Sequence, residues 1–320
     1  MIEETVQNNN SPELISLNAF LEPSNTKTTL INGGTSVYWE QGDEISVLFG
    51  SQREKFISSS SEPSTSTEFW GSLDLSIPVS SENPIWGLYP YDKDAKILNN
   101  QILTFVPPSQ EARVGTFAKN ANLSLAKSSD FSLRFFNVCG GLRFSLTKGG
   151  IKRIVFEALN GESIAGRFTI GFQNDEPVVI KANSGLNRIQ LIPADGGYFK
   201  LGEWYYLVAI PGDLQHGFKI TFYRDNSIGQ IVSKEPRIIK RGVFGSIPNI
   251  DSQVSFSSYL PEAIDMGLPS GTKWGSFNLG ALYPEEIGDY YAWGETETKG
   301  IYDSDTYKWL DETSKKYLTK

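Results

Sequence analysis

Histidine and cysteine, two side chains that often carry catalysis, occur once each in this sequence, as His216 and Cys139. A nucleophilic cysteine needs a base beside it, and the common zinc sites need several Cys or His ligands. His216 follows a Pro-Gly-Asp stop at 211–213 and is interpreted as a turn residue before the next strand. Cys139 precedes a glycine pair and is interpreted as a small buried side chain. The sequence therefore argues against Cys/His zinc sites, disulfide frameworks and Ser-His-Asp catalysis.

Carboxylates are more numerous, at 37 Asp and Glu residues, and could bind calcium or cleave glycosidic bonds. Asp92-Lys-Asp94 and Asp303-Ser-Asp305 begin like calcium-binding loops, but neither has the Gly and Glu that such a loop requires later. We interpret both as solvated turn carboxylates. A glycosidase needs two carboxyl groups roughly 5 to 9.5 Å apart in a cleft, and nothing in the sequence selects such a pair. No P-loop, nucleophile-elbow or dinucleotide-binding motif occurs, so we predict no catalytic residue, metal ligand or cofactor.

Aromatic side chains are the remaining candidates for ligand contact. Flat rings can cover the apolar faces of sugar rings, and several lie close together in the first half of the chain. Core packing is the alternative, because segment 86–91 alternates like a strand that ends at a proline. The candidate glycan contacts are Trp70, Trp86, Tyr89 and Tyr91.

The charge balance restricts the partners. A formal charge of -8 and an isoelectric point near 4.9 argue against nucleic acid and anionic membrane surfaces, which bind Lys and Arg. No apolar run reaches the roughly 18 residues of a membrane span, and the first residues do not read as a secretory signal. The chain is then either cytoplasmic or a mature protein whose leader was removed. The polar, Asn-rich residues 1–13 fit a tether that such a leader would leave.

Short segments with a two-residue period dominate the chain, separated by Gly, Asn, Asp and Pro. In 44–49, Ile45, Val47 and Phe49 share one face, and segments 142–147 and 218–223 alternate in the same way. Segment 204–210 is apolar on both faces, as expected of a central strand covered on both sides. This pattern is typical of an all-β sandwich or barrel, so we predict an all-β fold nearly free of helices.

Breaks in this pattern divide the chain. A Ser-Ser-Asp break at 128–130 separates residues 14–130 from residues 131–257, each long enough for its own core. After Ser257 the composition shifts to Gly and aromatics, and residues 258–320 are too few for a comfortable separate core. Residues 306–318 carry a weak helical stripe. We predict two domains and a short, partly irregular C-terminal extension.

A series of motifs in order along the chain resembles the fimbrillin-like family, surface proteins of anaerobic Gram-negative gut and oral bacteria. The similarity runs from about Leu14 to Ser257, most of the chain, and the ordered set is more specific than any one motif. Its members are Thr26-Lys-Thr28, Trp39-Glu-Gln-Gly-Asp-Glu-Ile45, Trp86-Gly-Leu-Tyr-Pro-Tyr91, Phe136-Asn-Val-Cys-Gly-Gly-Leu-Arg-Phe144 and Tyr205-Tyr-Leu-Val-Ala-Ile-Pro211.

This resemblance implies two tandem transthyretin-like β-sandwich domains, export as a lipoprotein to the outer membrane, and a role as a fimbrial subunit or adhesin. Assembly has a physical basis, because an open sheet edge can be completed by a strand from a neighbour. A lipid anchor would depend on a removed leader, since Cys139 lies within a predicted strand. The expected partners are other fimbrial subunits or a receptor on a host or bacterial surface.

The tail from Tyr259 to Trp274, followed by 288–295, is similar to the opening of a Gly- and Trp-rich module repeated in surface proteins of the same bacteria. Stalk pilins of the family end with their second sandwich, so the extra module favours a tip, accessory or stand-alone adhesin. We therefore expect a non-enzymatic surface adhesin of the fimbrium. A glycan-binding surface lipoprotein is the alternative, and a glycoside hydrolase that uses two carboxylates is a third hypothesis.

Overall fold

The computed structural model describes residues 12–22, 38–258, 262–279, 281, 288, 290–296, 306–311 and 316–317. The chain divides into two compact units, Met1–Phe256 and Ser257–Lys320. The described residues form strands and turns without a helix, which confirms the all-β prediction. A membrane-spanning helix is likewise not found in this part of the chain. Residues 1–11 of the predicted tether and the Thr26–Thr28 motif lie outside the described residues.

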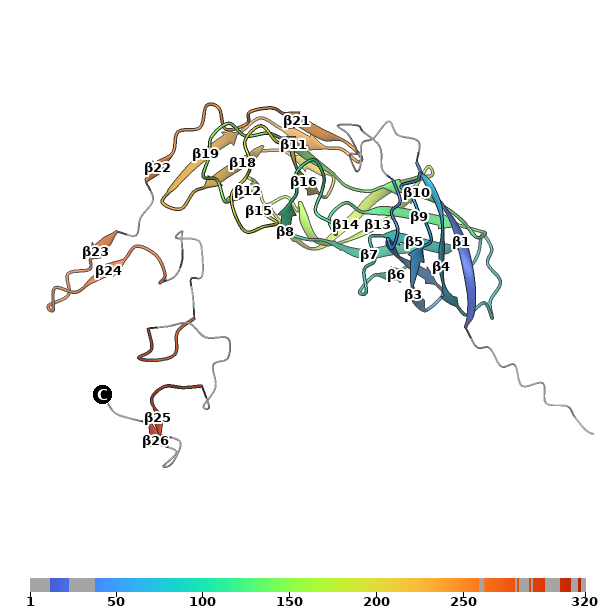
Figure 1. Ribbon diagram of the computed structural model, residues 1–320, viewed down its shortest axis with the longest axis horizontal. Helices are drawn as coiled ribbons and strands as arrows, with labels where there is room; N and C mark the ends of the chain where they lie inside the picture. The colour runs from blue at the N-terminus through green and yellow to red at the C-terminus, as the bar shows by residue number, and fades with distance from the viewer. Residues whose placement is uncertain are drawn as a thin grey trace, which may run out of the picture. The chain divides into compact units, whose positions relative to one another are not determined.

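A closed barrel encloses the first core (Figure 1). Its strands, in spatial order, are β1 (Glu13–Leu21), β10 (Ser132–Asn137), β9 (Ser124–Ser128), β5 (Ile85–Tyr89), β2 (Glu44–Phe49), β3 (Gln52–Ser58) and β4 (Ser66–Leu73). The barrel closes where β1 runs parallel to β10, with Asn18 opposite Ser132. The predicted face of β2 is confirmed, since Ile45, Val47 and Phe49 all lie in the barrel core.

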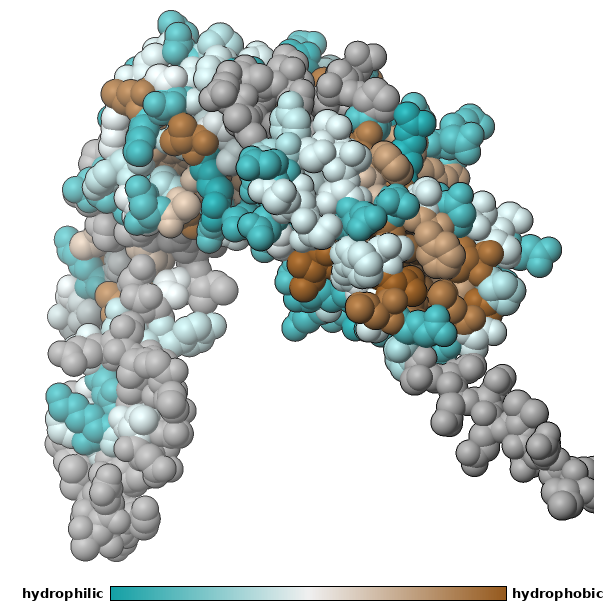
Figure 2. Space-filling view, turned by 45° about the vertical axis from the view of Figure 1, so that its right-hand side comes forward, coloured by the Kyte–Doolittle hydropathy of each residue, from teal (hydrophilic) through white to brown (hydrophobic). Residues whose placement is uncertain are grey.

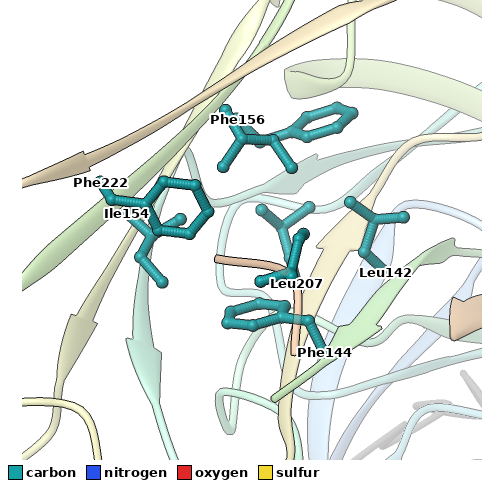
Figure 3. A pocket seen from close by; sticks show the side chains of 8 residues that line it. Leu142, Phe144, Ile154, Phe156, Leu207 and Phe222 are labelled. Carbon is teal, nitrogen blue, oxygen red and sulfur yellow. The ribbon is translucent and has the colours of Figure 1, made fainter. Parts of the chain in front are cut away.

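A second core lies between two sheets of the same unit. One sheet has the order β16 (Tyr205–Ala209), β11 (Gly140–Phe144) and β21 (Phe244–Ile247). The other includes β19 (Ser227–Ser233), β18 (Phe218–Tyr223), β12 (Arg153–Ala158), β15 (Arg188–Pro193) and β8 (Ser109–Ala112). In Figure 3, Ile154 and Phe222 of the second sheet meet Phe144 and Leu207 of the first across a void of about 10 Å³.

A further sheet covers the outside of the barrel. Its order is β14 (Glu176–Leu186), β13 (Ala165–Gln173), β7 (Gln101–Val106) and β6 (Lys96–Leu98), and β17 (Gly212–Leu214) pairs separately with β20 (Arg237–Ile239). Leu48 of β2 and Trp86 of β5 point away from the barrel core into the second core, where Phe172 of β13 lies 5.9 Å from the Trp86 ring. β2 and β5 are therefore covered on both faces, which explains their nearly continuous burial.

Strands from both sides of residue 130 share these sheets. β10 follows that residue yet completes the barrel, and β7 precedes it yet pairs with β13. A turn signal marks where a strand ends but not which sheet the next strand joins. The barrel therefore includes a strand from beyond the expected boundary at residue 130. The division into two transthyretin-like domains stays a prediction.

The C-terminal unit contains short strands: β22 (Ser257–Ser258), β23 (Ala263–Asp265), β24 (Lys273–Gly275), β25 (Leu310–Asp311) and β26 (Lys316–Tyr317). The helix expected over 306–318 is wrong for the described residues, because β25 pairs with β26 as a hairpin. The apolar positions of that stripe are interrupted by a polar run, and so short a helix is costly to nucleate. Trp274 and Trp293 are 63% and 89% exposed in this unit.

Candidate functional site

A cleft of about 530 Å³ lies at one rim of the barrel, where β2 and β9 begin and β5 ends. Three segments form its walls: residues 38–44 before β2, residues 89–91 at the end of β5, and residues 113–124 between β8 and β9. Leu21 at the end of β1 completes the lining. Charged groups, amides and hydroxyls line it, together with three tyrosines. Cavities of this volume are in the usual range for small-molecule sites.

The first wall is a tight turn held by Asp43. Its carboxylate accepts the backbone N–H of Glu40 at 2.8 Å, and its own N–H donates to the Glu40 carbonyl at 3.2 Å. Gly42 occupies the left-handed region at φ 78°, which side-chain-bearing residues rarely adopt. Trp39, 1% exposed, anchors the turn in the barrel core. The sequence Trp-Glu-Gln-Gly-Asp thus builds a rigid wall from local hydrogen bonds and one buried ring.

Tyr89 and Asp43 join the first wall to the second. The Tyr89 hydroxyl donates to the Asp43 carboxylate at 3.2 Å, and its ring meets Trp39 edge-on at 5.2 Å. Burial raises the pKa of Asp43, opposed by the hydrogen bonds from Glu40 and Tyr89. Burial also raises the pKa of Tyr89 far above its ordinary value, and the Asp43 charge adds to that effect. Tyr89 therefore stays protonated and acts as a fixed donor.

Tyr91 is held from two sides. Its N–H donates to the Glu44 carbonyl at 2.9 Å, and the Lys55 ammonium lies 4.6 Å from the centroid of its half-buried ring. Lys55 also pairs with the Glu44 carboxylate at 2.9 Å. The backbone bond places Tyr91 at the rim, and the ammonium contact favours this position of its ring.

The third wall is anchored in the second core. Phe117 is 7% exposed, and its ring lies 4.8 Å from those of Tyr206 and Phe244. The N–H of Gly115 donates to the Trp204 carbonyl at 2.8 Å. The cleft therefore lies where the barrel rim meets the second core, a common place for binding sites.

Two residues of this third wall carry buried polar atoms that the protein leaves without a partner. Among the described residues, Asn122 Oδ1 and Arg113 Nε are buried without a hydrogen-bond partner, and both residues line the cleft. Such atoms are costly unless a water or a ligand completes them. Lys119 on the same wall is exposed, and its positive charge offsets a small part of the rise in the pKa of Asp43 that burial causes.

The structure brings together two of the four aromatic candidates. Tyr89 and Tyr91 line the cleft. Trp86 is 1% exposed, because the β13 sheet covers this outer face of β5 and the Lys127 ammonium lies 4.8 Å from its ring centroid. It therefore offers no surface for a glycan. Glycan contact by Tyr89 and Tyr91 stays a prediction.

Trp70 is exposed, but it lies away from the cleft on the outer face of β4. It is 43% exposed and pairs across strands with Ile57, which is 46% exposed. Figure 2 shows apolar side chains gathered on the surface near the start of β1, the strand that pairs with β4. Trp70 therefore has an exposed apolar cross-strand neighbour and does not line the cleft.

The structural interpretations of the other single residues are confirmed. Cys139 is fully buried, but it lies between β10 and β11 rather than within a strand as expected. Burial raises the pKa of its thiol to about 12, so little thiolate forms at neutral pH. His216 is an exposed turn residue before β18. Asp92 caps a turn, since its carboxylate accepts the N–H of Asp94 at 2.8 Å and the Thr104 hydroxyl at 2.9 Å. Asp303 and Asp305 lie outside the described residues.

The residues that the sequence did not suggest are those of the third wall. Arg113, Lys119 and Asn122 stand in an irregular polar segment without a motif or period. The first and second walls carried a signal, because both belong to motifs of the fimbrillin-like series. Within the described ranges, no group of three His, Cys, Asp or Glu residues is arranged to hold a metal ion.

No protein-family model matches this chain, and no curated protein matches it either. Among solved structures it is similar to a proposed cell adhesion protein from Bacteroides ovatus, at 10% identity and a TM-score of 0.46, over 77% of this chain and 96% of that one. A proposed cell adhesion protein from Bacteroides thetaiotaomicron matches at 12% identity and a TM-score of 0.35, over 77% and 98% of the two chains. At these scores neither likeness establishes a function for this chain.

Proposed function

We propose that this chain is a non-enzymatic cell-surface adhesin that binds its receptor through the cleft at the barrel rim. The observation that carries the proposal is the cleft itself, a cavity lined by both polar and apolar groups, with one donor and one acceptor in its wall that have no protein partner. The fimbrillin-like motif series supplies the cellular role. We place the protein on the outer membrane or fimbrium, as a tip, accessory or stand-alone adhesin.

Two of the three carboxylates that line the cleft are held by other protein groups, which supports binding rather than hydrolysis. Asp43 accepts hydrogen bonds from Tyr89 and Glu40, and Glu44 is paired with Lys55. A general acid or base must exchange its proton with the substrate, whereas these groups are committed to holding the walls. They serve as fixed walls of a receptor site.

Assembly with other fimbrial subunits is part of this proposal. The barrel strands pair on both sides, so a donated strand would have to join another sheet. β14 is the longest edge strand described, but its pairing with β13 contains two register shifts, and it carries Pro177 and Lys181. Such features discourage pairing with another chain, so we expect cleft-mediated adhesion to operate without strand exchange at β14.

Adhesion is tested directly with the full chain immobilised on beads. Coated beads should adhere to at least one surface of a panel of bacterial, epithelial and mucin surfaces more strongly than albumin-coated beads do. Lys119→Ala should reduce this adhesion, while Lys181→Ala, a matched change at an exposed lysine of β14, should leave it unchanged. Equal adhesion by the two variants, or adhesion no greater than that of albumin beads, would contradict the proposal. So would new reducing ends after incubation of glycans with the protein.

A further inference from the structure

We infer that the cleft binds a short neutral saccharide. This inference rests on the proposed function, because the saccharide would be the part of the receptor that the adhesin recognises. It goes further in naming the chemistry of the ligand and the residues that select it, most of them on the third wall.

Two atoms of the third wall, one acceptor and one donor, have no hydrogen-bond partner among the described residues, and we take them as the groups that a ligand would complete. Asn122 Oδ1 needs a donor, and Arg113 Nε needs an acceptor. A hydroxyl group does both, since it donates one hydrogen bond and accepts others. A sugar presents several hydroxyls on one small ring, so one ligand can complete both atoms.

Side chains of both signs line the cleft, with Glu40, Asp43 and Glu44 on one side of the balance and Arg113 and Lys119 on the other. Glu44 pairs with Lys55 at 2.9 Å, and Arg113 pairs with Glu111 at 3.0 Å. Lys119 acts electrostatically on Asp43 across the cleft. A phosphate or another strongly charged ligand would meet groups of both signs, whereas a neutral ligand meets none that repels it. The charge distribution therefore favours a neutral ligand.

The tyrosines provide the apolar part of the site. The Tyr91 ring is held in place by Lys55, and Tyr89 contributes a phenol that stays protonated. A sugar ring has apolar C–H faces as well as hydroxyl edges, so it matches an aromatic surface set among polar groups. A cavity of about 530 Å³ has room for a short oligosaccharide.

A peptide fits the cleft less well. Extended peptides are commonly bound by pairing with a free strand edge. β2 pairs with β3 and β5, and β5 pairs with β2 and β9, so these cleft strands have both edges occupied. A peptide therefore has no strand edge to pair with on β2 or β5, and the side-chain hydrogen bonds of a saccharide are the better match.

The test measures binding of the full chain to an array of neutral oligosaccharides, acidic oligosaccharides and peptides, followed by calorimetry with the strongest neutral ligand. Tyr91→Ala and Asn122→Leu should each weaken affinity about tenfold, the effect of roughly one lost hydrogen bond or stacking contact. The matched controls Tyr198→Ala and Asn183→Leu, both at exposed positions, should stay within about twofold. Cooperative melting curves with a Tm no lower than that of the native chain establish that each variant is folded.

Three outcomes would overturn the inference. No neutral oligosaccharide binds, only acidic saccharides or peptides bind, or both cleft variants keep full affinity. Bead adhesion separates it from the proposed function. Adhesion that needs Lys119 but is not inhibited by the free saccharide overturns the inference and leaves the adhesin role standing. Saccharide binding without adhesion to any surface supports the inference and overturns the adhesin role.

Discussion

The rim cleft and the void of the second core differ in size and in the side chains that line them. The void is about 10 Å³ and is lined by Leu, Ile and Phe side chains, all but Ile250 from two facing sheets (Figure 3). The cleft is about fifty times larger and is lined by tyrosines, amides and charged groups on turns and irregular segments. The void arises where regular strands pack, and the cleft arises where the segments between strands from two cores meet.

This difference separates stability from binding. A void too small for water is an ordinary packing defect, and every side chain around it contributes to folding. The cleft keeps buried polar atoms unsatisfied, which is unfavourable for folding and useful for a ligand. Changes at the void should therefore alter the free energy of unfolding, and changes at the cleft should alter affinity.

The largest expected effect on stability is at the void. Phe222→Ala removes a fully buried ring and should lower the free energy of unfolding by about 3 to 5 kcal/mol, measured by urea titration. The affinity of the folded fraction for the cleft ligand should not change. Phe105→Ala is the matched control, because Phe105 is 40% exposed and should cost much less. A similar cost for both variants would contradict the assignment of this core.

Phe117 tests the connection between the two regions, because it belongs to the second core and anchors the third wall. Phe117→Ala should lower the free energy of unfolding by about 3 kcal/mol and also weaken ligand binding, since the wall loses its anchor. Phe117→Leu should retain most of the stability and most of the ligand affinity. Urea titration and calorimetry measure the two effects. Full affinity in the folded alanine variant would show that the wall does not depend on this ring.

A substitution of Asn122 at the cleft should change the free energy of unfolding in the opposite direction from the two phenylalanine substitutions. Asn122→Leu removes a buried acceptor that lacks a donor and keeps a similar volume, so it should raise the free energy of unfolding by about 1 kcal/mol in urea titrations. Affinity should fall at the same time. Asn183→Leu, on the exposed part of β14, should change neither by much. A destabilised Asn122→Leu variant would mean that the amide is satisfied in solution.

The smallest expected effect concerns pH. Burial raises the pKa of Asp43 above 3.8 in the folded chain, so its stabilising contribution is complete below the unfolded value and is lost as pH rises through the folded value. The stability of the native chain relative to Asp43→Asn should therefore fall as pH rises from about 4 toward neutrality. Urea titrations of both proteins across this range provide the measurement.

Asp225 is the matched control for Asp43. The hydroxyl of Tyr198 and the Lys152 ammonium lower the pKa of Asp225. Its contribution is present above the unfolded pKa and is lost as pH falls through the folded one, so the comparison with Asp225→Asn should show the opposite slope. Equal slopes for the two variants would show that burial of Asp43 does not control its titration.

Local side-chain patterns were sufficient to predict the class of fold and the faces of many strands. Alternation over 44–49 placed Ile45, Val47 and Phe49 in the barrel core, and the continuous apolar run near 205–209 became a strand buried on both faces. Turn and strand context also predicted the structural roles of His216 and Cys139. These properties depend on the side-chain period and on neighbours in sequence, which a local pattern contains.

The fate of the aromatic candidates depended on which sheets pack together. Trp86 and Leu88 share the outward face of β5, and both are buried in the second core because the β13 sheet lies over that face. Tyr89 and Tyr91, from the same motif, reach the rim and line the cleft. Alternation along a strand separates its two faces, but it does not say which of them another sheet covers.

The third wall shows the same limit of local patterns. Arg113, Lys119 and Asn122 meet residues 40–44 only because β5 and β9 pair and Phe117 packs on the second core. Pairing between distant strands depends on the whole chain, since loop closure and burial must be favourable together. A local sequence pattern contains the period of each strand but not its partner, so the cleft could be recognised only in the folded protein.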